Sequence, residues 1–214
     1  MGFKYLDPDE IQKKSFEIIR RELSEKGYFS GPKAHADDER AGVTIRCIHT
    51  TADLEYADTL EFSDGAVDTF RALVKESPVI VTDTNMALAG INKIRPEKYG
   101  CRIRCFMADK DVAAEAKARG ITRASVSMER AMALPGPVIF VIGNAPTALI
   151  TLYEHIRSGA YVPAFVIGAP VGFVNVVEAK EMIASCDIPY IINRGRKGGS
   201  PVAAAIVNAL FETL

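Results

Sequence analysis

The stretch that decides the fold is PVIFVIGNAPT, residues 137–147, in which an unbroken apolar run ends in glycine and small residues. A short run of Val, Ile and Phe without polar alternation is typical of a strand that is buried on both faces of a parallel sheet. A helical stretch over residues 145–158 follows it directly. The segment therefore predicts one strand–turn–helix unit, and the rest of the chain can be compared with it.

Four more short apolar strands are predicted, over residues 78–83, 101–106, 162–168 and 188–193. Helical stretches fall between or after them, over residues 66–75, 84–92, 109–119, 124–133, 174–186 and 199–212. Apolar strands that alternate with helices indicate a parallel sheet covered on both faces. We expect an α/β fold: a single doubly wound domain with a mainly parallel five-stranded sheet flanked by helices.

The N-terminal part predicts helices before the first strand. Asp7 and Pro8 suit a helix start, and an apolar stripe then continues to a stop near Gly27. Residues 37–53 are ambiguous, because their β-branched centre could form a strand while their acidic start favours a helix. We adopt the helix, and expect a helical segment of about residues 1–60 to pack on the α/β core within one domain, residues 1–214.

Composition narrows the function. The 214 residues carry a formal net charge of -1, which does not favour nucleic acid or an anionic membrane as a partner. No apolar run reaches the roughly 20 residues that span a bilayer, and residues 1–10 do not resemble a signal peptide, so we expect a cytoplasmic protein. The four cysteines lack the spacing of a metal site and are predicted to be buried free thiols.

The loops that follow the strands are the expected ligand site, because ligands of open α/β sheets bind outside the carboxyl ends of the strands. These loops, over residues 82–86, 143–147, 168–173 and 193–200, are rich in glycine and small residues, which let the backbone approach a ligand. Arg194, Arg196 and Lys197 add positive charge. We expect a large, flat or polyanionic ligand, and disfavour a nucleotide because GxxxxGK[ST] and GxGxxG are both absent.

Three polar residues near the N-terminus each have two interpretations. His49 is either a buried structural histidine or a proton carrier, the role for which proteins most often use an imidazole. Arg46 is either a surface charge or, if residues 37–53 are helical, a charge on the same face as His49. Ser15, the one hydroxyl on its apolar helix stripe, is either bonded to a carbonyl one turn earlier or turned toward a ligand.

Two further residues follow strands or begin helices. Arg123 opens a predicted helix, where a cation opposes the helix dipole, and an anionic ligand would explain its presence. Asp83 follows the first predicted strand, where it either caps the next helix or faces the ligand.

Several motifs together resemble the precorrin-8X and cobalt-precorrin-8 methylmutases of cobalamin biosynthesis. GNAPTAL (143–149), G-x-PVGFV (168–174) and GRKGGS (195–200) are similar to blocks of that family, as are R-x-x-H (46–49) and the KSF segment (14–16). They occur in the family's order and span nearly the whole chain. The departures are small: Lys14 for Arg, Ala169 for a larger apolar residue and Ala179 for Ser.

This resemblance implies a function: isomerisation by migration of a methyl group from C-11 to C-12 of a corrin precursor, without a cofactor or metal, by a homodimer. It implies that His49 is the catalytic proton donor or acceptor. With the loop analysis, the expected substrate contacts are Ser15, Arg46, Asp83, Met86, Arg123, Gly143, Asn144, Gly172, Phe173, Arg196, Lys197 and Gly198. The alternative is a non-catalytic corrinoid or tetrapyrrole carrier that uses the same basic crevice.

Overall fold

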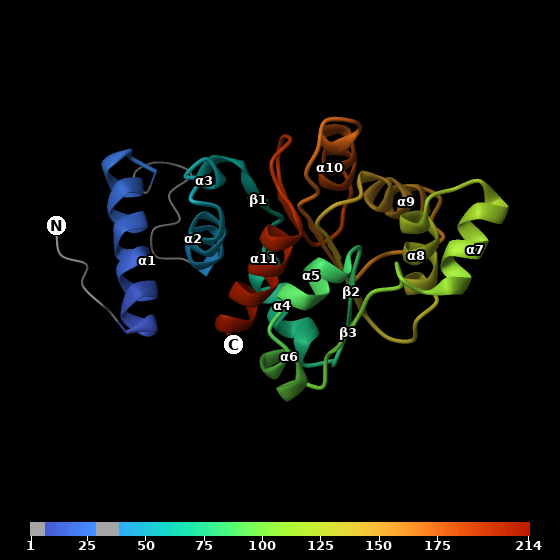
Figure 1. Ribbon diagram of the computed structural model, residues 1–214, viewed down its shortest axis with the longest axis horizontal. Coiled ribbons are helices and arrows are strands. Elements are labelled where there is room, and N and C mark those ends of the chain that lie inside the picture. The colour runs from blue at the N-terminus through green and yellow to red at the C-terminus, as the bar shows by residue number, and fades with distance from the viewer. Residues whose placement is uncertain (1–6, 29–38) are drawn as a thin grey trace.

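The computed structural model describes residues 7–28 and 39–214, which form one sheet with helices on both faces (Figure 1). The strands are β1 (Leu60–Phe62), β2 (Val79–Thr82), β3 (Arg102–Arg104), β4 (Val138–Ile142), β5 (Phe165–Gly168) and β6 (Tyr190–Asn193). The helices are α1 (Pro8–Glu25), α2 (Glu39–Thr51), α3 (Tyr56–Thr59), α4 (Ala66–Val74), α5 (Asn85–Gly90), α6 (Ile94–Lys98), α7 (Lys110–Arg119), α8 (Arg123–Met132), α9 (Pro146–Arg157), α10 (Val176–Ala184) and α11 (Ser200–Glu212).

The strand order is β1-β6-β5-β4-β2-β3, and all neighbours except β1 and β6 run parallel. The five predicted strands are confirmed, but a prediction of five in total was one short. The missed strand, β1, has only three residues, includes Glu61, and pairs antiparallel with β6 at the sheet edge. An edge strand is only partly buried, so it lacks the apolar run that marks the central strands.

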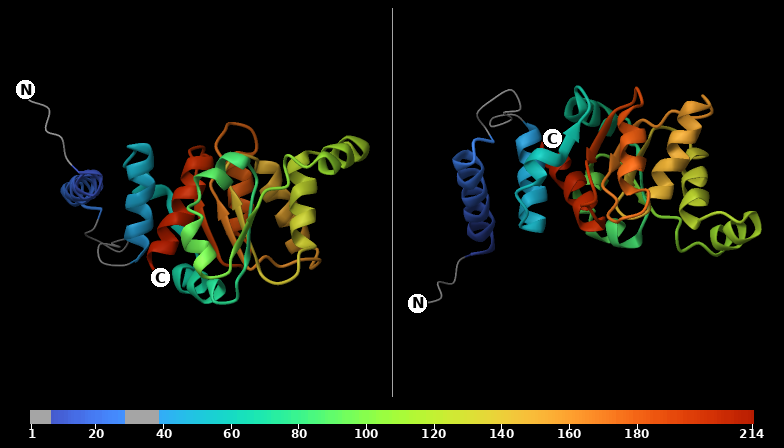
Figure 2. Two further views of the ribbon diagram at one scale, coloured as in Figure 1. Left: turned by 60° about the horizontal axis from the view of Figure 1, so that its bottom comes forward. Right: turned by 90° about the horizontal axis from the view of Figure 1, so that it is seen from above.

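Successive residues of a strand point to opposite faces of the sheet, so their side chains contribute to two separate cores. Ile139, Val141 and Ile167 belong to the core under α2, α4 and α11. Phe140 and Val166 belong to the core under α8, α9 and α10. Figure 2 shows the two helix layers on opposite sides of the sheet. The predicted doubly wound architecture is thereby confirmed.

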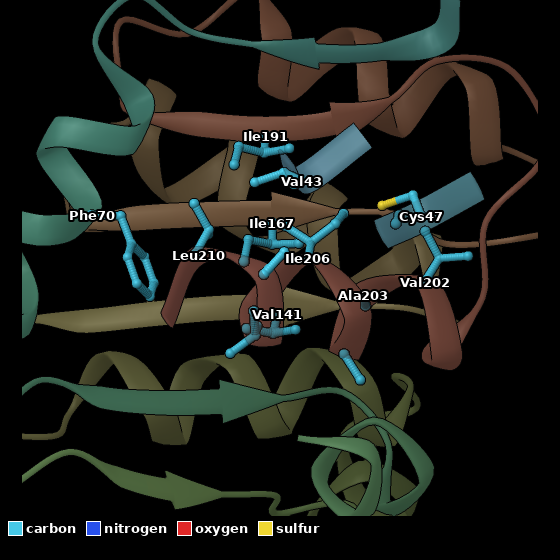
Figure 3. Close-up of a cluster of buried hydrophobic side chains, with 14 of the residues drawn as sticks. Val43, Cys47, Phe70, Val141, Ile167, Ile191, Val202, Ala203, Ile206 and Leu210 are labelled. Carbon is cyan, nitrogen blue, oxygen red and sulfur yellow. The ribbon is translucent and has the colours of Figure 1, made fainter. Parts of the chain in front are cut away.

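Helix α11 lies at the centre of the first core, and ten of its 13 residues are buried. Val202, Ile206 and Leu210 face the strand residues Val141 and Ile167 (Figure 3). Its small residues at 203–205 are also buried, because α2 and α5 pack against its other sides. The buried sides of α11 are apolar, as burial requires, and only Pro201, Asn208 and Glu212 of this helix are exposed or partly exposed.

The ambiguous segment 37–53 is a helix over its described part, as predicted. Asp37 and Asp38 lie outside the described residues, while α2 begins at Glu39. Helix α2 packs between α1 and α11, so it is buried on two sides, and its β-branched composition reflects burial rather than a strand. Helix α1 forms the outermost layer beyond α2 in Figures 1 and 2, and exposes Ile11 and Ile18.

The cysteines are free thiols, as predicted, but the prediction that they are all buried was wrong for two of them. Cys47 and Cys101 are buried, and burial raises the pKa of Cys47 to about 12 and that of Cys101 to about 11. Cys105 and Cys186 are half-buried. Among the described helices, none combines the length and the apolar character that a bilayer span needs.

The contact between β4 and α11 gives a testable prediction. An added methyl group at Gly143 would lie 2.7 Å from Cα and 2.9 Å from the amide nitrogen of Ser200, and backbone atoms cannot yield cheaply. We expect Gly143→Ala to lower the free energy of unfolding by about 1–3 kcal/mol in urea denaturation. Gly42→Ala is the control, because no atom lies within 4 Å of its methyl position on α2, and we expect it to be neutral or stabilising. Equal effects of the two changes would contradict this account.

Candidate active site

A groove of about 430 Å³ lies beside α11, between α2 and the α5–α6 turn. Helix α11 forms the floor of the groove. His49 and Arg46, which were predicted to share one face of α2, both line it. The lining residues are Arg46, His49, Thr50, Gly90, Asn92, Arg95, Pro201, Ala204, Ala205, Asn208 and Glu212. The prediction that Arg46 and His49 share a helical face is therefore confirmed.

His49 lies in the last turn of α2 and is exposed to the groove. Its ring meets the ring of Phe16 edge to face, with 5.3 Å between the centroids. Phe16 comes from α1, so the outer helix supports the histidine from behind. No described residue hydrogen-bonds the imidazole, so both ring nitrogens can serve a ligand. His49 is thus not the buried structural histidine that was the alternative.

The far end of the groove is charged. The carboxylate of Glu212 accepts hydrogen bonds from Nη2 of Arg46, with 2.6 Å to each oxygen, and Nη1 of Arg95 lies 3.4 Å from Oε1. The Arg46 guanidinium also stacks over Phe16, 4.9 Å from the ring centroid. Two arginines and one glutamate therefore close the groove, one helical turn from His49.

The α5–α6 turn is held against α11 by one asparagine. The Asn208 side chain donates to the carbonyl of Gly90 (2.9 Å) and accepts from the amide of Asn92 (2.8 Å). Gly90 permits this approach, because a Cβ there would lie only 2.9 Å from Cβ of Ala204. The α5–α6 turn thereby directs α6 and its Arg95 side chain toward the groove.

The crevice at the carboxyl ends of β2 and β4 is filled by protein. The chain reverses direction across the sheet between these strands, which is the usual ligand position. Asp83 is fully buried there and accepts three hydrogen bonds, from the amides of Gly143 (2.8 Å), Asn144 (2.8 Å) and Ala145 (2.7 Å). Burial raises the pKa of its carboxyl, and the three amides oppose that shift. Asp83 therefore shapes this loop, and does not cap the helix that follows it.

Two of the three cations expected to face a ligand are already paired. Arg194 bonds to Glu61 (2.9 Å) and to Glu181, and Lys197 bonds to Glu55 (2.7 Å) and to Asp53. Their charges hold the 194–199 loop to its neighbours in this conformation. The sequence could not reveal these pairs, because the partners of Lys197 are more than 140 positions away in the chain.

The same loop is held from below by Lys180, which is 0% exposed. Its ammonium donates to the carbonyls of Gly195 and Lys197, each at 2.8 Å, and no described carboxylate pairs with it. Burial lowers its pKa to about 8. Asn193 adds a third bond, from its amide to the carbonyl of Lys197 (2.9 Å).

Close packing explains the glycine of this loop. A Cβ at Gly198 would lie 2.2 Å from the carbonyl oxygen of Ala169, and its φ of +156° is unfavourable for other residues. The Gly172 amide donates to the carbonyl of Arg196 (3.2 Å). Gly172 and Gly198 thus join the two loops after β5 and β6.

Four predicted contact residues project into solvent. Phe173 is 85% exposed and Met86 is 66% exposed, and the Arg196 guanidinium lies 5.5 Å from the Phe173 ring centroid. Arg123 begins α8 and is exposed, with only a 3.5 Å bond to the carbonyl of Met107. These apolar and cationic groups remain available to a ligand.

The groove and the glycine loops adjoin. Pro201 lines the groove and comes directly after Gly198, Gly199 and Ser200. The Ser200 hydroxyl is 2.7 Å from that of Thr84, which begins α5. Ser15 precedes Phe16 on α1 and is half-buried, but does not line the groove.

Of the residues that line the groove, the sequence analysis named only Arg46 and His49 as site residues. Those that it missed include the polar side chains of Asn92, Arg95, Asn208 and Glu212. One signal was present, since Asn208 interrupts an otherwise apolar helix. Arg95 carried no signal, because only the fold brings it beside α11.

A doubly wound sheet and a groove lined by two arginines and an exposed histidine define the class as an α/β protein with a charged groove of small-molecule size. No three His, Cys, Asp or Glu side chains gather as a metal site would require in residues 7–28 and 39–214.

Comparisons with known proteins narrow this class. The precorrin-8X methylmutase family profile matches residues 10–213. The chain is 40% identical to the cobalt-precorrin-8 methylmutase of Priestia megaterium, over 96% of this chain and 88% of that protein. It is 41% identical to the precorrin-8X methylmutase of Pseudomonas aeruginosa, over 95% of each. The structure of the Thermus thermophilus precorrin-8X methylmutase superposes with a TM-score of 0.81 at 36% identity, over 94% of this chain and 96% of that one.

The chain belongs to the precorrin-8X methylmutase family. It is therefore an enzyme, an isomerase of the methylmutase type, as its motifs indicated.

The buried lysine gives a prediction about pH. Lys180 has a folded-state pKa of about 8 against the usual 10.5, so between these values the unfolded chain binds a proton that the folded chain has released. Stability from this group must therefore rise with pH in that window, by on the order of 3 kcal/mol. We expect the difference in unfolding free energy between the unsubstituted protein and Lys180→Met to grow from pH 8 to 10.5.

Lys117→Met is the control, because Lys117 is exposed on α7. Its difference from the unsubstituted protein should stay flat over the same range. Parallel stability curves for Lys180→Met and the unsubstituted protein would show that Lys180 does not titrate in this way.

Proposed function

We propose that the enzyme moves a methyl group from C-11 to C-12 of precorrin-8 or cobalt-precorrin-8, giving hydrogenobyrinate or cobyrinate, with His49 as proton donor and acceptor. The observation that carries this proposal is the exposed imidazole in a groove whose end holds two arginines. The relatives named above, which carry both names, support the choice of reaction.

The proposed mechanism assigns one role to each part of the site. Arg46, and the exposed Arg123 and Arg196, bind carboxylate side chains of the macrocycle, because guanidinium groups pair well with carboxylates. Phe173 and Met86 cover apolar ring surface and exclude water. Asp83 and Gly198 hold the loops that carry these groups, together with Gly143, Asn144 and Gly172. Lys197 fixes its loop through Asp53 and Glu55.

His49 then acts on the ring. Its protonated imidazole donates a proton to a ring atom, which makes the conjugated system more electrophilic while the methyl group migrates. The carbon–methyl bond at C-11 breaks as the bond at C-12 forms, and the proton returns to His49. Atoms and charge balance without a co-reactant, so the scheme requires no cofactor.

The test is conversion by the purified protein with no added cofactor. Incubation with precorrin-8, and separately with cobalt-precorrin-8, should change the absorption spectrum without a change in mass, and the faster reaction identifies the natural substrate. A protein that binds the corrinoid but leaves it unchanged would be a carrier, which is the second candidate.

We also propose that the enzyme is a homodimer in the cytoplasm. A corrin ring with its side chains exceeds the groove, and α1, the outermost helix, exposes Ile11 and Ile18. A second copy that covers α1 would remove this apolar surface from water. Sedimentation equilibrium should give twice the chain mass of 23.2 kDa, and the mass of one chain would reject the dimer.

The role of His49 predicts a separation of turnover from binding. We expect His49→Ala to lower kcat by about 10²–10⁴-fold, because a positioned proton donor contributes that factor. The dissociation constant for hydrogenobyrinate should change little, since the arginines remain. His155→Ala is the control, because His155 lies on α9, away from the groove. Near-normal turnover by His49→Ala would refute the proton role.

A further inference from the structure

The arginine pair at the end of the groove is arranged around a carboxylate that belongs to the protein itself. Glu212, on the last turn of α11, lies between Arg46 of α2 and Arg95 of α6. The three side chains come from three helices and all line the groove. Their formal charges sum to +1, so the cluster keeps one positive charge that Glu212 does not neutralise.

The pairing is also incomplete. Nε of Arg46 is buried and has no hydrogen-bond partner among the described residues. Arg95 reaches Glu212 only at 3.4 Å, and its side chain is 43% exposed. Buried donors without a partner are costly. An ion pair that only links two helices needs neither an unsatisfied hydrogen-bond donor nor a second arginine. A binding site for a further carboxylate needs both, and both are present here.

We propose that Arg46 and Arg95 form a carboxylate receptor for one acidic side chain of the corrinoid, and that Glu212 is its resident counter-ion, displaced on binding. This inference rests on the proposed function for the identity of the ligand. It assigns a substrate-binding role to Arg95 and a competing role to Glu212.

The carboxylate receptor lies close to His49. Arg46 precedes His49 by three residues on α2, which is about 4.5 Å along the helix axis. A macrocycle held by one carboxylate at Arg46 and Arg95 therefore has its ring edge next to the imidazole. Exchange of one carboxylate for another costs little Coulomb energy, but a neutral ester or amide cannot replace Glu212. The receptor thus selects the acidic corrinoid over a neutralised one.

The α5–α6 turn holds the receptor open. Asn208 bonds to Gly90 and Asn92, and the Asn92 side-chain oxygen accepts from the amide of Ile94 (2.8 Å), the first residue of α6. Arg95 therefore keeps its place when Glu212 leaves.

The experiment measures dissociation constants by calorimetry for hydrogenobyrinate and its fully methyl-esterified form. Arg95→Ala should weaken binding of the acid by about tenfold, since a charge-assisted hydrogen bond is lost. Binding of the ester should be unchanged, and Arg95→Lys should recover part of the loss. Lys98→Ala is the matched control, because it removes the same charge from α6 outside the groove.

The direction in which Glu212→Gln changes the affinity for the acid decides between the two roles of Glu212. If Glu212 competes with the ligand, its neutralisation should tighten binding of the acid about threefold or more, even if the thermal midpoint falls. Glu97→Gln, an exposed change on α6, controls for net charge and should have a smaller effect. If Glu212 merely orients the arginines, Glu212→Gln will weaken binding, and that result overturns the proposal.

Failure of this inference and failure of the proposed function differ. Unsubstituted protein that converts its substrate, with Arg95→Ala binding as tightly as Lys98→Ala, would overturn the receptor alone. Protein that binds hydrogenobyrinate in the predicted pattern without turnover would overturn the isomerase proposal alone. An absence of any binding would overturn both.

Discussion

The enclosure of α11 is the constraint on which the rest of the structure depends. This helix is apolar on every side except the one that carries Asn208 and Glu212, so the sheet alone cannot bury it, and α2 and α5 must cover the remaining apolar surface. Because α2 is recruited for this purpose, His49 and Arg46 arrive beside α11. Because α5 is recruited, the turn that carries Arg95 arrives on the other side. The position of the groove therefore follows from the burial of one helix, whereas its polar lining residues are those that the proposed reaction needs.

Internal polar contacts explain why the groove lies where it does. Asp83 occupies the crevice at the point where strand order reverses, and Lys180 holds the neighbouring loop without a counter-ion. Both groups are buried, and both use backbone partners on glycine-rich segments. The usual ligand position of a doubly wound sheet is thus filled with protein, while Arg123, Arg196 and Phe173 remain exposed around it. A ligand that uses both regions has to extend from the groove across the N-terminal end of α11.

The sequence predicted what depends on local pattern. Apolar runs such as residues 137–143 located every central strand, and the family motifs located the loops. The edge strand β1 escaped, because three partly buried residues leave no periodic signal. Arg194 and Lys197 were expected to add positive charge beside the ligand, yet each is paired with two carboxylates of the protein. Arg95 and Glu212 could not be predicted, because their neighbourhood exists only after α6 and α11 have packed. Long-range pairing is the information that one sequence does not contain.

The contact between Gly90 and Ala204 has a consequence for how this family can evolve. These two positions are 114 residues apart in the chain, yet there is no space between them for one more methyl group on the glycine. A larger residue at Gly90 would need glycine in place of Ala204, and a residue larger than alanine at position 204 has no compensating reduction at Gly90, so the turn that carries Arg95 would be displaced from α11. The side-chain sizes at positions 90 and 204 therefore restrict each other. Among related enzymes we expect the two positions to covary or to remain small together, whatever happens to the exposed residues around them.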